Sequence, residues 1–210
     1  MDYRTTEVYK FFLFLEQYAF GDLQLFHKLA KEAEGKDAEN QFENSNFPPT
    51  TMYPYGFEFN FGKPINCRAT IPFTLMIFSC MDILGFIVRN GNKNSHRETQ
   101  KNIEEFYRFI SPMPTQNEIN CLVKLFRHGL MHNYFPKLAQ SISYHSENPS
   151  TLFFDDNSGI CLNVNILEKH LEEGFMNIKN NESLYDKMGT NFSDLNKYYL
   201  DNEKRYLLKT

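Results

Sequence analysis

The segment from Ile71 to Val88 limits the folds open to this chain more than any other part of the sequence. It is almost wholly apolar, with Pro72 near its start and Asp82 within it. A membrane span needs about 20 mostly apolar residues, and a carboxylate in mid-span costs several kcal/mol. We therefore expect no membrane partner but a helix buried inside a globular protein, with Pro72 in its first turn.

The composition supplies enough bulk for a large aromatic core. The 210 residues include 21 Phe and 12 Tyr but no Trp, and 41% of the chain is hydrophobic against 23% charged. These proportions exclude wholesale disorder. A formal net charge of −4 argues against a polycationic protein that coats nucleic acid or anionic membranes, so any nucleic-acid role requires a local basic patch.

The number and spacing of the cysteines indicate the redox state of the thiols and the cellular compartment. Cys67, Cys80, Cys121 and Cys161 are widely spaced and form no CxxC pair, which is typical of neither a disulfide framework nor a zinc ribbon. The N-terminal residues carry charge early and lack the apolar stretch of a signal peptide. We expect reduced thiols and a cytoplasmic location.

Apolar residues at helical spacing predict a mainly α-helical (all-α) fold, a single domain over residues 1–210. Gly21 and Asp22 predict a break or an N-cap between the first two helices. The motif-bearing core is expected over about 71–137 and the C-terminal helices over about 166–208. The expected helices are 6–20, 22–34, 72–88, 101–110, 117–134, 166–180 and a last stretch within 181–210.

Two regions interrupt the helical pattern. Residues 35–70 hold four prolines, so this excursion cannot contain a long helix, although the alternation of residues 57–61 predicts one short strand. Residues 141–144, 151–154 and 159–165 are candidates for short paired strands. The fold is thus expected to contain at most a small β-hairpin.

The helix expected over 117–134 has apolar residues on two faces. Because water alone does not favour Leu or Cys, the second face predicts a second packed surface, which is another helix or a partner subunit. Gly129 costs about 1 kcal/mol of helix propensity, which indicates a close approach to the backbone. At about 100° per residue, the core face holds Ile119, Leu122, Val123, Phe126 and Leu130, and the second face holds Cys121, Leu125, His128 and His132.

The end of this helix carries a motif. Arg127 is followed by the polar His128, by His132 five positions after the arginine, and then by Asn133 and Tyr134. The pattern resembles the signature of the HEPN family (higher eukaryotes and prokaryotes nucleotide-binding), an all-α family whose motif is Arg, four to six residues, then His. The Arg-x4-His-x-Tyr form of HEPN toxins is also met. The resemblance extends over about a third of the chain, because the apolar segment before the motif looks like the helix that often precedes it.

This resemblance implies a metal-independent endoribonuclease without a cofactor, whose site lies between two subunits of a homodimer, in a toxin or defence context. Arg127 would bind phosphate, His132 would act as acid or base, and His128 would support the site. The residue types suit this chemistry, because histidine titrates near neutral pH and a guanidinium holds two phosphate oxygens. Lys124, Asn133 and Tyr134 are candidates for substrate binding.

The resemblance also implies partners. RNA is the expected substrate, and a cognate antitoxin or a nucleotidyltransferase is a possible protein partner, since Tyr134 matches the tyrosine that such enzymes modify. Lys124, Arg127 and Lys137 stand against Glu118 alone between residues 118 and 137, a local excess of positive charge in an acidic chain.

Simpler interpretations stay open for the same residues. Arg127 is a candidate ion-pair partner of Asp82, because a carboxylate in an apolar stripe needs a donor. His128 and His132 have the i, i+4 spacing of two metal ligands, although no third ligand is marked. Tyr134 is suited to plain packing, and Cys121 to filling a small buried space.

Other functions are also possible. One is a non-catalytic HEPN-like module that binds a partner protein or a nucleotide and keeps the motif for structure. Another is an assembly protein that uses residues 35–70 as its interface. The polar run 89–94 is expected to be a solvated turn.

Overall fold

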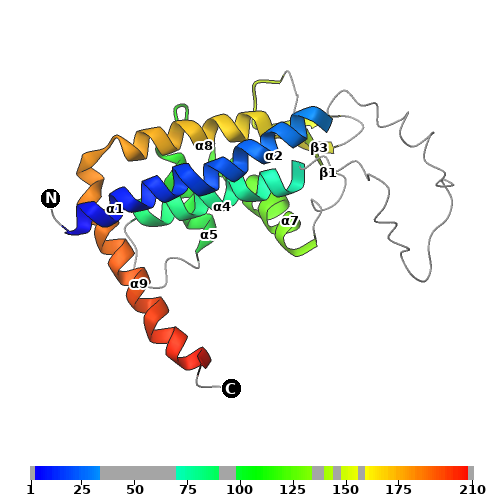
Figure 1. Ribbon diagram of the computed structural model, residues 1–210. Helices are drawn as coiled ribbons and strands as arrows, with labels where there is room; N and C mark the ends of the chain where they lie inside the picture. The colour runs from blue at the N-terminus through cyan, green and yellow to red at the C-terminus, as the bar shows by residue number, and fades with distance from the viewer. Residues whose placement is uncertain are drawn as a thin grey trace.

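The computed structural model describes a mainly α-helical protein with one small sheet, as the sequence predicts (Figure 1). The first two helices form one rod rather than two separate helices. It consists of α1 (Tyr3–Phe14), the π-helical turn η1 (Leu15–Ala19) and α2 (Phe20–Ala33). The described residues are 3–33, 70–89, 98–133, 140–143, 148–155 and 159–207.

The break predicted at Gly21 and Asp22 is wrong. The backbone N–H of Phe20 donates to the carbonyl of Leu15, five residues earlier, and the helix then continues through Gly21. Leu15 and Leu23 are buried on either side of this point. Because a helical glycine costs only about 1 kcal/mol, burial of the flanking leucines keeps the helix continuous.

Helix α4 (Thr70–Val88) is the buried central helix that the apolar segment predicts. Eleven of its residues are buried, and it contacts α2, α5, α8 and α9. By length and composition α4 could cross a membrane, with a mean hydropathy of 2.1, but 61% of its apolar window is buried inside the protein. One such helix is weak evidence for a membrane span, because the core helix of a globular protein has the same character.

Helices α4 and α5 (Thr99–Tyr107) approach each other very closely. A Cβ added at Gly85 of α4 would stand 1.8 Å from the backbone oxygen of Asn102 in α5. The absence of a side chain at Gly85 therefore permits contact between the two backbones.

The motif lies on a helix made of α6 (Gln116–Cys121), the π-helical turn η3 (Leu122–Arg127) and α7 (His128–Asn133). Thr115 begins it with a capping box, in which the Thr115 side chain accepts from the N–H of Glu118 and the Glu118 carboxylate accepts from the N–H of Thr115. The core face predicted for this helix is confirmed, since all five of its residues are at most 1% exposed: Ile119, Leu122, Val123, Phe126 and Leu130.

The sheet is larger than the hairpin allowed by the sequence prediction. Strands β2 (Leu152–Asp155) and β3 (Gly159–Asn163) are antiparallel neighbours, and β1 (Gln140–Ser143) joins β3 in parallel, giving the order β1-β3-β2. The three candidate segments thus do form strands. A parallel neighbour has no hairpin turn to mark it in the sequence, so the pairing of β1 with β3 could not be predicted from the candidate strands alone.

The C-terminal helices close the bundle. Helix α8 (Val164–Lys179) runs beside the N-terminal rod, and after the short turn η4 (Glu182–Leu184), α9 (Tyr185–Leu207) returns to α1 and α4 (Figure 1). Aromatic pairs join these elements, with Phe12 and Phe175 ring centroids 5.7 Å apart and those of Phe11 and Phe192 4.6 Å apart. The strand predicted over 57–61, and the excursion before Thr70, lie outside the described residues.

Candidate functional site

Arg127 is the last residue of η3, and its side chain is 21% exposed. Its Nη2 lies 3.7 Å from Oδ2 of Asp82 in the central helix α4. The ion pair considered as an alternative for Arg127 is therefore confirmed. A π-helical turn accommodates an extra residue, and here the N–H of His128 donates to the carbonyl of Val123. The 100° periodicity assumed for the two faces does not hold across this turn.

Asp82 is held in place by two hydrogen-bond donors of α5 and by the cation of Arg127 in η3. Its Oδ1 accepts from Nδ2 of Asn102, and its Oδ2 accepts from Oγ1 of Thr99, both at 2.8 Å, in addition to the pairing with Arg127. The prediction that this carboxylate has donor partners is confirmed. A carboxylate fixed in this way defines where the Arg127 guanidinium lies.

Arg89 completes this polar network. Its Nη1 donates to Oδ1 of Asn102 at 2.9 Å, and its Nη2 pairs with Glu98. The expectation of a solvated turn is wrong for Arg89, whose side chain is only 14% exposed. Hydrogen bonds from Lys101 and Arg89 hold the pKa of the Glu98 carboxyl below its usual range.

Sequence reasoning missed Asn102, Thr99 and Arg89 as members of this network. Asn102 is fully buried although it is polar, and it precedes the buried Ile103 on the core face of α5. A polar residue among the core positions of an amphipathic helix was the available signal. Which group it would bond to depended on the α4–α5 contact, which is not visible in the sequence.

The second face of the motif helix is partly covered by the chain itself. Cys121, Leu125 and His128 are neither fully buried nor fully exposed, and Leu125 packs against the hydrophobic core. Burial raises the pKa of the Cys121 thiol, which keeps it protonated and agrees with the filler alternative. Lys124 is exposed to solvent.

The other motif residues have no described side chain. The side chains of His132 and Asn133, and all of Tyr134, lie outside the described residues. The contact between Arg127 and His132 therefore stays a prediction. Among the side chains that are described, no three His, Cys, Asp or Glu residues lie close enough together to hold a metal ion. That result does not test the pair of His128 and His132.

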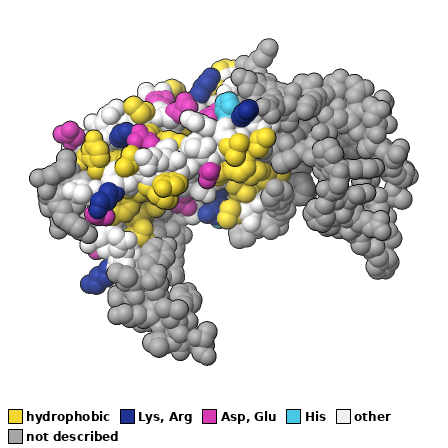
Figure 2. All heavy atoms as spheres, in the orientation of Figure 1, with side chains coloured by type: hydrophobic (Ala, Val, Ile, Leu, Met, Phe, Trp, Pro, Cys, Tyr) yellow, Lys and Arg dark blue, Asp and Glu magenta, His cyan; other side chains and the backbone are white. Residues whose placement is uncertain are grey.

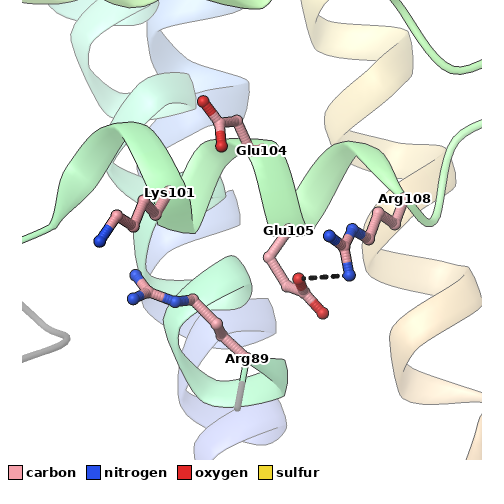
Figure 3. A pocket seen from close by; sticks show the side chains of 5 residues that line it. All are labelled: Arg89, Lys101, Glu104, Glu105 and Arg108. Carbon is pink, nitrogen blue, oxygen red and sulfur yellow. Dashed lines mark ion pairs between the residues drawn. The ribbon is translucent and has the colours of Figure 1, made fainter. Parts of the chain in front are cut away.

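A hollow of about 300 Å³ lies beside α5 rather than at the motif. Figure 3 shows Arg108 paired with Glu105, at 3.1 Å, and Arg89 reaching the hollow from the end of α4. Each cation has a carboxylate partner, because Arg89 and Lys101 both pair with Glu98. With its charges compensated internally, the hollow offers little attraction for an ionic ligand. Its lining residues are Arg89, Lys101, Glu104, Glu105 and Arg108.

The assignment of a site thus depends on the motif and on the network around Arg127. In a scan against protein-family models and in searches of curated proteins and solved structures, no match to this chain was found.

Proposed function

We propose that this chain is a HEPN-like endoribonuclease that cleaves RNA without a metal ion through Arg127 and His132. The observation that carries the proposal is the position of Arg127, which is paired with a fixed carboxylate and still 21% exposed. A guanidinium has five N–H donors in a planar fork, and a single carboxylate at 3.7 Å leaves several of them for phosphate oxygens. Asp82 then acts as a positioning residue for the phosphate-binding group.

The chemistry requires one proton acceptor and one source of positive charge. In the proposed reaction an RNA 2′-OH loses its proton to a histidine as its oxygen attacks the adjacent phosphorus. The bond from phosphorus to the 5′ oxygen then breaks, and the leaving oxygen takes up a proton. His132 is the acid or base, Arg127 stabilises the charge on the phosphorane, and His128 supports the site. A homodimer would bring two copies of the Arg127 and His132 pair into one cleft, and together they would form the complete site.

A non-catalytic binding module is the second candidate. The observation that favours it is the same ion pair, because the contact with Asp82 gives Arg127 a structural reason to be present without RNA. In this case Arg127→Ala weakens the fold, and RNA plays no part.

RNA cleavage by the purified protein in EDTA tests the proposal. We expect cleavage to survive chelation and to fall at least about 100-fold in His132→Ala and in Arg127→Ala. Arg108→Ala is the matched control, since this arginine is 67% exposed and pairs with Glu105 away from the motif. Circular dichroism establishes that each variant is folded.

The remaining outcomes separate the two candidates. Cleavage that survives both motif substitutions contradicts the nuclease proposal. If the folded wild type does not cleave RNA, the binding module is the better description. The variant Asp82→Asn tests the positioning role. This role predicts that RNA binds more weakly, while the pH dependence of cleavage that His132 sets stays unchanged.

A further inference from the structure

The N-terminal rod carries an apolar stripe on the side turned away from the core. Val8, Leu15 and Leu23 are buried on its inner side, whereas six large side chains on the outer side are between 38% and 61% exposed. Figure 2 shows hydrophobic side chains on the face of the molecule along which α1 and α2 run. Exposed apolar patches of a few hundred Å² are often functional. The outer stripe consists of Tyr9, Leu13, Phe14, Tyr18, Leu25 and Leu29.

We propose that the outer stripe binds the outer stripe of a second copy of this chain, with the two rods antiparallel. Four of its six residues are spaced symmetrically about Ala19: Tyr9 and Leu29 lie ten residues to either side, and Leu13 and Leu25 lie six. A two-fold axis near Ala19 therefore places Tyr9 of one copy opposite Leu29 of the other, and Leu13 opposite Leu25.

Two of the described charges beside the outer stripe are paired within the chain. Lys10 pairs with Glu7 at 2.8 Å, and Glu16 pairs with Lys179 of α8. Among the side chains of the rod that the structure describes, there is thus no row of unpaired cations to attract a polyanion such as RNA or an anionic membrane. An apolar protein surface of the same kind is the better match.

Gly21 supports the same arrangement. No described heavy atom lies within 4 Å of the position of an added Cβ, so packing inside the described chain does not explain this glycine. It stands two residues from the proposed axis, where a missing side chain lets a second backbone approach closely.

The area of the outer stripe sets the expected strength. Large apolar side chains have about 150–250 Å² each, so six that are about half exposed offer about 500 Å² per copy. The pair would bury about 1,000 Å² in total, which is near the lower limit of specific interfaces. An interface of this size is typical of a weak, reversible dimer.

Sedimentation equilibrium of the full chain tests the contact. We expect the full chain to self-associate, and we expect this association to weaken at least tenfold in the double variant Leu13→Glu, Leu25→Glu, which leaves the monomer or, where the motif dimer of the proposed function forms, that dimer. Met176→Glu is the control, because Met176 is 50% exposed on α8 outside the stripe. Gly21→Leu should weaken the dimer although leucine has the higher helix propensity. A wild type that stays monomeric at several hundred micromolar, or equal dimerisation by the stripe and control variants, would overturn the proposal.

Disulfide cross-linking tests the antiparallel register, with the wild type giving the background from the native cysteines. Leu13→Cys combined with Leu25→Cys should link two copies, and so should Tyr18→Cys alone. Leu13→Cys alone should not, because its two copies stand about 18 Å apart along the rods and a disulfide needs Cα atoms within about 7 Å. Self-linking by Leu13→Cys indicates a parallel pair and contradicts the register. RNA cleavage is a separate readout, so this contact and the nuclease proposal can fail independently.

Discussion

The N-terminal rod and the motif helix have the same plan but differ in what covers their second face. Each has a π-helical turn in its middle, η1 or η3, and each carries apolar residues on two sides. The second face of the motif helix is half-covered, with Leu125 packed on the core, whereas the outer stripe of the rod is exposed. Apolar residues on a second face therefore show that a contact is favourable, and not which molecule provides it.

The ion pairs at the two π-helical turns differ in the same way. Arg127 of η3 pairs with Asp82, and these side chains are 21% and 19% exposed. Glu16 of η1 pairs with Lys179, and these are 38% and 31% exposed. Water screens the second pair more strongly, so the first should matter more to the fold.

The largest effect should come from comparing two glycines, Gly21 of the rod and Gly85 of α4, the helix that holds Asp82 against Arg127 of the motif helix. Gly85→Ala places a Cβ 1.8 Å from the Asn102 backbone oxygen, and separating α4 from α5 should cost at least about 3 kcal/mol. Gly21→Ala meets open space and should stabilise the helix by up to about 1 kcal/mol. Urea unfolding measures both. A Gly85→Ala protein as stable as the wild type would contradict the close contact.

The two ion pairs provide the next comparison. Asp82→Ala leaves Thr99, Asn102 and Arg127 without their shared acceptor and should cost about 2–3 kcal/mol of unfolding free energy. Glu16→Ala should cost less than about 1 kcal/mol. Urea unfolding of Asp82→Ala, Arg127→Ala and the double variant gives their coupling energy. If Asp82→Ala and Glu16→Ala lowered the unfolding free energy equally, the two ion pairs would not differ in their contribution to the fold.

A smaller effect concerns the start of the motif helix. Thr115→Ala removes the capping box and should cost about 1 kcal/mol in a thermal or urea melt. Thr190→Ala is the control, because this exposed hydroxyl donates only to the Asp186 carbonyl within α9. Losses of the same size in both variants would show that the cap has no special role.

The smallest effect is a pH dependence that arises in α8, outside the two regions. Burial lowers the pKa of His170 below its usual 6.5, although Glu173 and Glu118 oppose this shift. The unfolded chain then binds more protons than the folded one just below pH 6.5, so stability should fall as the pH drops through this range. His170→Asn should flatten that part of a stability profile measured between pH 5 and 8. An unchanged slope would assign the dependence to another group.

Much of the fold could be predicted from the sequence because it depends on local patterns. The apolar run that ends at Val88 could only be a buried helix or a membrane span, and the core face of the motif helix follows from its spacing. Asp82 within an apolar stripe already required a donor, and Arg127 was one candidate. The break at Gly21 was not correct, because burial of Leu15 and Leu23 outweighs the low helix propensity of one glycine.

Other features depended on contacts between segments that are distant in the sequence. The parallel pairing of β1 with β3 has no local turn signal, and the burial of Arg89 follows from the approach of α5 to α4. The two π-helical turns changed which residues share a face, and a wheel with a constant angle per residue cannot show this.

The sequence by itself determined the helical class, the central apolar helix and the motif that contains Arg127 and His132, because each depends on residue type and short spacing. Only the tertiary structure decided that Asp82, held by Thr99 and Asn102, is the partner of Arg127. It alone also showed that the rod keeps an exposed apolar stripe. The physical reason is that hydrogen bonds and burial depend on distances between helices, and a sequence specifies these only through the packing of the whole chain.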